Sequence, residues 1–181
     1  HGSLEVQDGK IRAFAESQSR QPEAMDGEGG WLLPGLIELH TDNLDKFFTP
    51  RPKVDWPAHS AMSSHDALMV ASGITTVLDA VAIGDVRDGG DRLENLEKMI
   101  NAIEETQKRG VNRAEHRLHL RCELPHHTTL PLFEKLVQRE PVTLVSLMDH
   151  SPGQRQFANR EKYREYYQGK YSLTEAQMQQ Y

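Results

Sequence analysis

The fold is decided by the stretch Trp31-Leu32-Leu33-Pro34-Gly35-Leu36-Ile37-Glu38-Leu39-His40-Thr41-Asp42. A Pro-Gly pair ends a polar segment and introduces a short apolar run, which predicts a loop leading into a buried strand. Successive side chains on a strand point to opposite faces, so Glu38, His40 and Asp42 share one face while Ile37 and Leu39 share the other. We therefore expect a polar triplet at the end of a buried strand.

Segments typical of strands and helices alternate after this first strand. Residues 74–78, 116–124 and 142–148 are predicted strands, and residues 58–72, 91–109 and 130–139 are predicted helices. Repeated strand–helix units favour a parallel α/β fold, either a barrel or a doubly wound sheet. Upstream, residues 4–14 alternate around Asp8-Gly9 and predict a β-hairpin. The tyrosine-rich tail, 151–181, contains Ser172-x-x-Glu175, which resembles a helix capping box.

Composition limits the kinds of partner. A net charge of -6 gives no general attraction to nucleic acid or to an anionic membrane, and favours a small substrate. No apolar run approaches the roughly 18 residues that a membrane helix needs, so we expect a soluble protein. The chain opens His1-Gly2-Ser3 without an initiator Met or a signal core, which suggests a cut within a longer, cytoplasmic chain. The single Cys122 is expected to be a small buried side chain in a reducing compartment.

His40 and Asp42 are the first candidate metal ligands. In a β/α barrel the inward side chains at the carboxyl ends of the strands form the active site, and an imidazole two residues before a carboxylate can grip one metal there. Taken alone, the pair is better explained by a strand-end histidine and an aspartate that caps a turn. The interpretation therefore depends on the other strand ends.

Two further strand ends carry ligand-type residues. On the 116–124 strand, Glu123 shares a face with His119 and Arg121, and either binds or bridges metals or pairs with one of those neighbours. The 142–148 strand is followed by Asp149 and His150, of which one faces the mouth according to register. We favour His150 because imidazole suits the common hydrolytic metals. Three such strand ends favour a metal site over chance.

The chemistry expected from this site is hydrolysis by metal-activated water. A bound divalent ion lowers the pKa of its water to about 7, and the chain shows no Ser-His-Asp pattern that would supply another nucleophile. Residues 43–53 are expected to form a loop after the first site, and its Lys46, Arg51 and Lys53 either hold phosphate oxygens or are ordinary surface charges.

The remaining histidines are less decisive. His126, next to His127, either points into the mouth or caps the helix that begins near Thr128. His59 and His65 are assigned to a helix surface or to packing.

The stretch from Trp31 to Asp42 resembles the amidohydrolase superfamily, whose first barrel strand follows a Pro-Gly pair and ends in paired metal ligands. Three segments further resemble, within that superfamily, the diphosphatases of bacterial phosphonate breakdown. They are His40-Thr41-Asp42-Asn43-Leu44-Asp45-Lys46-Phe47, Cys122-Glu123-Leu124-Pro125-His126-His127 and Met148-Asp149-His150-Ser151-Pro152-Gly153-Gln154. The resemblance implies a partial (β/α)8 TIM-type barrel over residues 31–181, with residues 1–30 forming part of a small β-sandwich. It also implies one or two zinc or manganese ions held by His40, Asp42, Glu123 and His150, and leaves room for a homo-oligomer formed through the barrel.

The implied reaction cleaves a phosphorylated sugar phosphonate, a ribose 1-methylphosphonate 5-triphosphate, to its 5-phosphate and pyrophosphate. The superfamily's later barrel strands, with a further metal-binding His and a general-base Asp, would follow Tyr181, so no catalytic base is expected in this segment. We therefore expect the segment alone to be inactive and poorly soluble. Two alternatives remain open: hydrolysis of a cyclic amide or ester, and a noncatalytic metal-binding or interaction module that uses the tyrosine-rich tail.

Overall fold

A computed structural model describes residues 1–51, 54–84, 91–151, 153 and 159–171. The chain divides into two compact units, His1–Pro34 and Gly35–Tyr181, and each is described by itself.

The first unit is built on a hairpin. Strands β1 (Ser3–Gln7) and β2 (Lys10–Ala15) pair antiparallel, which confirms the hairpin predicted around Asp8-Gly9. Asp8 and Gly9 both have positive φ, 52° and 72°, as the two central residues of a type I′ turn require. Val6, Ile11 and Phe14 are exposed on this hairpin. The rest of the expected β-sandwich stays a prediction.

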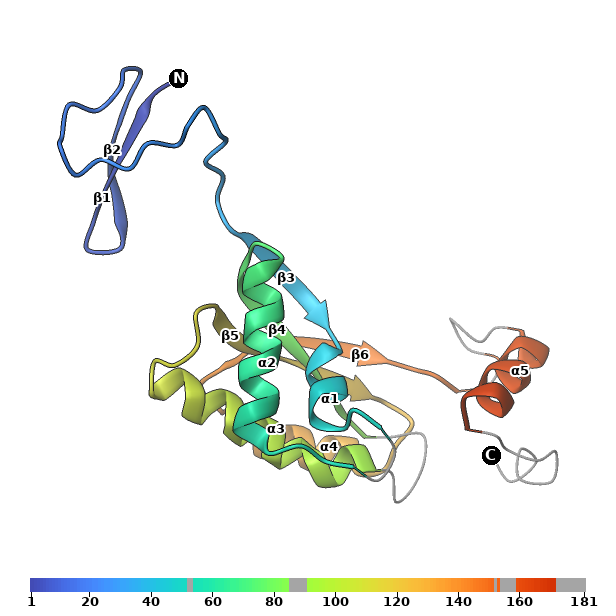
Figure 1. Ribbon diagram of the computed structural model, residues 1–181. Coiled ribbons are helices and arrows are strands. Elements are labelled where there is room, and N and C mark those ends of the chain that lie inside the picture. The colour runs from blue at the N-terminus through green and yellow to red at the C-terminus, as the bar shows by residue number, and fades with distance from the viewer. Residues whose placement is uncertain (52–53, 85–90, 152, 154–158, 172–181) are drawn as a thin grey trace. The chain divides into compact units, whose positions relative to one another are not determined.

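The second unit is organised around a parallel sheet. Strands β3 (Leu36–Thr41), β4 (Ile74–Ile83), β5 (Glu115–Glu123) and β6 (Val142–Met148) lie side by side in chain order, and every neighbouring pair is parallel. Helices α2 (Ala58–Ala71), α3 (Asp91–Lys108) and α4 (Thr129–Leu136) cover one face of this sheet (Figure 1). The predicted parallel α/β architecture is confirmed, while closure into a barrel stays a prediction.

The hydrophobic core lies between the sheet and these helices. Val81 and Ile83 of β4 and Leu118, Leu120 and Cys122 of β5 alternate toward the helices, as period-two patterning requires. The predicted apolar stripe of α3 is buried at Leu96, Met99, Ile100 and Ile103, whereas the side chain of Leu93 lies outside the described part. Cys122 is buried as expected, and burial raises the pKa of its thiol.

Strand β3 corrects one expectation. Leu36, Ile37 and Leu39 are exposed, so the prediction of a buried strand was wrong. The physical reason is position, because β3 is at one edge of the sheet and pairs with β4 alone among the described strands. The strand alternates as expected, but the layer that would cover its apolar face is not among the described residues.

The segment after β3 also differs from its prediction. Residues 43–53 were expected to be a loop, but helix α1 (Asn43–Phe48) begins immediately after Asp42. Its Leu44 and Phe48 are spaced one helical turn apart and are fully buried in the core that also contains Met62 of α2. Burial of this apolar pair explains why so short a segment is helical.

The tail contains a helix that the sequence pattern did not predict, α5 (Arg160–Tyr171). Asn159 begins it, since its side-chain oxygen accepts the backbone N–H groups of Glu161 and Lys162 at 2.8 and 3.2 Å. The capping-box motif Ser172-x-x-Glu175 lies outside the described residues. None of the described helices combines the length and apolar character required to cross a membrane.

Candidate metal centre

The face of the sheet away from the helices carries polar side chains from three strands. His119 of β5 packs edge-on against the ring of His40 of β3, with ring centroids 5.0 Å apart. His119 Nδ1 lies 3.1 Å from the carbonyl oxygen of Leu39, so it carries the proton, and Nε2 accepts the hydroxyl of Ser146 at 2.8 Å. Burial, together with the nearby charges of His40 and Arg121, lowers the pKa of His119. The imidazole is therefore held neutral.

Asp42 faces this polar surface and does not cap a turn. It occupies the N-cap position of α1, but its carboxylate makes no capping hydrogen bond. Its Oδ1 instead lies 3.8 Å from His40 Nε2 and accepts a hydrogen bond from Arg121 Nη1 at 2.5 Å. The turn-capping alternative is thus wrong for Asp42. Arg121, one of the two residues considered as alternative partners of Glu123, pairs with Asp42.

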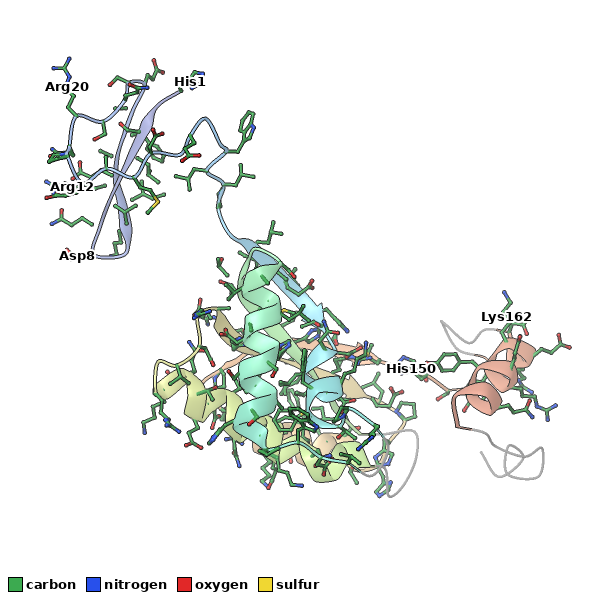
Figure 2. The ribbon with its side chains drawn as sticks, viewed as in Figure 1. His1, Asp8, Arg12, Arg20, His150 and Lys162 are labelled. Atoms are coloured by element: carbon green, nitrogen blue, oxygen red, sulfur yellow. The ribbon has the colours of Figure 1, made fainter. Side chains whose placement is uncertain are left out.

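Glu123 and His150 form a second pair at the carboxyl ends of β5 and β6. His150, which Figure 2 labels where the chain leaves β6, donates its backbone N–H to Glu123 Oε1 at 2.8 Å, and its Nδ1 lies 2.5 Å from Oε2. Asp149 turns instead to its own loop and accepts the N–H of Ser151. When a carboxylate holds one imidazole nitrogen, the other nitrogen is the one presented to a metal. His150, rather than Asp149, therefore contacts Glu123, and its role as a metal ligand stays a prediction.

The four predicted ligands thus lie as two pairs, His40 with Asp42 and Glu123 with His150. Within the described part of the chain, no three of them have donor atoms within 4.8 Å of one another. Their joint binding of an ion stays a prediction.

The predicted phosphate-binding residues belong to separate segments of the chain. Lys46 is exposed on α1, and Arg51 is exposed and bridges to Val54. Lys53 lies outside the described residues. His126 uses Nδ1 for Thr128, whose hydroxyl and backbone N–H lie 2.7 and 3.2 Å away, as expected for the turn that begins α4. This contact supports the capping alternative for His126, and its role at the mouth stays a prediction.

A second group of donors lies on the opposite, helix-facing side of the sheet. His65 of α2, Asp79 of β4 and His116 of β5 have ligand atoms within 4.8 Å of one another and fully buried side chains. Two imidazoles and a carboxylate are a donor set that could hold a divalent ion. His116 also contacts Asp66 of α2, which accepts the backbone N–H groups of Arg113 and Ala114.

The distances in this group are those of hydrogen bonds. His65 Nε2 lies 2.5 Å from Asp79 Oδ1, and His116 Nδ1 lies 2.7 Å from Asp79 Oδ2. Ligands of one tetrahedral ion with bonds of about 2.0–2.1 Å are separated by roughly 3.3 Å. Protons rather than a metal therefore fit between these atoms as they stand.

His116 carries positive charge in this arrangement. Its two ring nitrogens face two carboxylates, Asp79 at 2.7 Å and Asp66 at 3.1 Å, so both are protonated. Burial lowers the pKa of His116, but the hydrogen bonds and charges of Asp79 and Asp66 outweigh it and raise the pKa overall. Burial likewise raises the pKa of Asp79, and its bonds to His116 and His65 bring it below the usual value.

This buried group was not predicted from the sequence. His65 was assigned to surface or packing, and His116, Asp66 and Asp79 were not singled out. One signal was available, because Asp79 interrupts the apolar run from Ile74 to Ile83, and a carboxylate in a buried strand requires partners.

The chain was compared with known proteins to test the resemblance to diphosphatases. The chain is 98% identical over 180 residues to the alpha-D-ribose 1-methylphosphonate 5-triphosphate diphosphatase of Escherichia coli (strain K12). The resemblance to a diphosphatase of phosphonate breakdown is confirmed. The alignment covers 99% of this chain and 48% of the diphosphatase, so the chain spans about half the length of that relative. No family model matches the chain, and no solved structure matches it.

Proposed function

We propose that this chain is the metal-binding portion of a metal-dependent diphosphatase that cleaves alpha-D-ribose 1-methylphosphonate 5-triphosphate to the 5-phosphate and pyrophosphate. The observation that carries the proposal is the 98% identity to the E. coli diphosphatase over nearly the whole chain. Because the chain matches only 48% of that relative, the general-base Asp and a further metal-binding His are proposed to lie in the remainder.

The face of the sheet away from the helices, its inner face in a closed barrel, carries side chains of the types that bind a divalent ion. His40, Asp42, Glu123 and His150 would hold zinc or manganese, one ion or two. The separation of 3.8 Å between His40 Nε2 and Asp42 Oδ1 is close to that of two ligands on one ion. A divalent ion here would supply an activated water as the nucleophile.

In the proposal, the neighbouring side chains orient the metal ligands and balance the charge of the ligands and of the substrate. Arg121 donates a hydrogen bond to one oxygen of Asp42 and thereby fixes the orientation of the carboxylate. Hydrogen-bond partners of metal-binding carboxylates commonly have this role. Glu123 fixes the ring of His150 in the same way or joins the ion itself. Lys46, Arg51, Lys53 and His126 are proposed to hold the phosphate oxygens of the substrate.

We also propose a (β/α)8 barrel with a small β-sandwich for the whole protein, located in the cytoplasm, and the sheet edges support the barrel. Strand β3 exposes Leu36, Ile37 and Leu39 at one edge, and β6 exposes Val145 and Leu147 at the other. Exposed apolar edge strands call for further pairing, and closure of a barrel removes both edges.

The test uses a full-length chimaera, in which this chain replaces the matching half of the E. coli diphosphatase. We expect the chimaera to release pyrophosphate from the ribose triphosphate and to lose that activity with a chelator. His40→Ala should lower kcat/KM by more than the about 10- to 100-fold typical of losing an outer-shell partner of a metal.

His59→Ala is the matched control, since the side chain of His59 is exposed on α2 and its ion pair with Glu105 is equally exposed. Hydrolysis of hydantoins in place of the ribose triphosphate would favour the cyclic-amide alternative. Full activity of His40→Ala, or activity that is insensitive to chelation, would reject the proposed metal site.

A further inference from the structure

The buried network His65–Asp79–His116–Asp66 joins the elements behind the predicted metal site. Helix α2 supplies His65 and Asp66, β4 supplies Asp79 and β5 supplies His116, and each side chain is almost fully buried. Asp66 also accepts N–H groups from the backbone that leads into β5, at 2.9–3.1 Å. The network therefore fixes α2 to two strands of the sheet by polar contacts in addition to apolar packing.

Two contacts connect this network to the His40–Asp42 pair. Thr41, which lies between the two predicted ligands, is buried and is the register partner of Asp79 on β4. Helix α1 follows Asp42 directly, and its Phe47 ring lies 5.8 Å from the ring of His65. The network thus abuts both the strand that ends in the ligand pair and the helix that follows it.

We infer that His65, Asp79, His116 and Asp66 are positioning residues, which set the placement of His40 and Asp42 by holding α2 as the rigid surface on which α1 packs. Leu44 and Phe48 rest in the core that α2 shares, so displacement of α2 would displace Asp42. Hydrogen-bond networks of this kind hold one arrangement because every alternative leaves a buried charge without a partner. The consequence for metal binding rests on the proposed function.

The test measures position and metal binding separately in the full-length chimaera. Asp79→Asn removes the charge shared by His65 and His116 with little change of shape. We expect the backbone amide resonance of Asn43, whose N–H donates to Thr41 at 3.2 Å, to shift in protein labelled with ¹⁵N-asparagine, while that of Asn101 on α3 stays in place. The metal concentration for half-maximal activity should rise about tenfold, as small misplacements of reacting groups cost factors of this order or more.

A conservative pair separates positioning from simple loss of stability. His65→Gln keeps an N–H donor for Asp79 and should retain the parent's metal requirement, whereas His65→Leu should resemble Asp79→Asn. His59→Gln, on the exposed side of the same helix, is the control and should change neither measurement. Circular dichroism at the assay temperature confirms that each variant compared is folded. If Asp79→Asn does not fold, the comparison of His65→Gln with His65→Leu tests the inference in its place.

The outcomes distinguish this inference from the proposed function. An unmoved Asn43 resonance in a folded Asp79→Asn or His65→Leu variant overturns the positioning role, whatever the activity. A parent chimaera without metal-dependent activity rejects the proposed function, and the Asn43 resonance then decides the positioning role alone. A tightly bound metal ion that His40→Ala keeps and Asp79→Asn loses, measured by mass spectrometry, also overturns it, because the network would then be a metal site.

Discussion

His116 and His119 stand on the same strand, β5, but face opposite sides of the sheet and meet opposite surroundings. His116 lies on the closed side between two carboxylates, which raise its pKa against the effect of burial. His119 lies on the open side beside His40 and Arg121, and its pKa is lowered by burial and by their charges. The closed side has its charges paired internally, whereas the open side presents the half-exposed side chains of His40 and Asp42. This contrast separates a positioning network from a surface prepared for a ligand.

The largest effect expected from this contrast is on stability, compared by the same substitution on each side. Asp79→Asn should lower the free energy of unfolding of the chimaera by about 3 kcal/mol, because it leaves a buried charge without its partner. Asp42→Asn should cost less than about 1 kcal/mol, since the Asp42 carboxylate is 47% exposed and its pair with Arg121 is screened by water.

Urea denaturation of both variants, with metal removed by a chelator, measures the difference. Equal losses would show that the two sides do not differ in the way proposed. A destabilising effect of Asp42→Asn alone would place the structural charge network on the inner face instead.

The next effect is the pH dependence of stability. The folded pKa of His116 is raised, so its contribution is fully present below the unfolded value of about 6.5 and is lost as pH rises through the folded pKa. The pKa values of Asp66 and Asp79 are lowered, so their contributions are present above about 3.9 and are lost as pH falls through the folded values. The network should therefore stabilise most between these limits.

Urea denaturation of the parent and of His116→Gln at pH values from about 5 to about 9 measures this dependence. The stability difference between the two proteins should be greatest near the acidic end and should shrink above about pH 6.5. A difference that grows with pH would mean that His116 is neutral in the folded chain.

Much of the fold could be predicted because its elements follow local rules. The strand–helix order, the α3 stripe and the hairpin turn at Asp8-Gly9 depend on periodicity and on turn residues that are visible in the sequence. The exposure of Ile37 could not be predicted, because burial of an edge strand depends on what pairs beside it. Helix α1 was missed for a related reason, since its two apolar residues become decisive only when α2 is present to bury them.

The candidate site shows the same division. Period-two alternation placed His119, Arg121 and Glu123 on one face, and the contacts of these residues agree with it. The pairing of Arg121 with Asp42 depends on how the strands are arranged, and so does the contact between Glu123 and His150. The network around Asp79 joins residues from three elements far apart in sequence, and no local motif records such a contact.

The smallest effect tests the contrast between the two histidines themselves. In metal-free chimaera with ¹³C-labelled histidine, NMR titration should show His119 losing its proton at a lower pH than His116, as their opposite pKa shifts require. A base whose folded pKa is lowered contributes stability above the unfolded value and loses it as pH falls, which is the reverse of His116.

Ser146→Ala and Arg121→Met separate the local causes of the lowered pKa of His119. Removing the positive charge of Arg121 should raise the pKa of His119. Removing the Ser146 hydroxyl should raise it too, because that hydroxyl donates a hydrogen bond to the neutral ring and so favours the unprotonated form. Neither substitution should move His116, because the sheet lies between them. Titration of the two rings at the same pH, or movement of His116 in either variant, would show that the faces are electrostatically coupled and that the closed network does not stand apart from the open site.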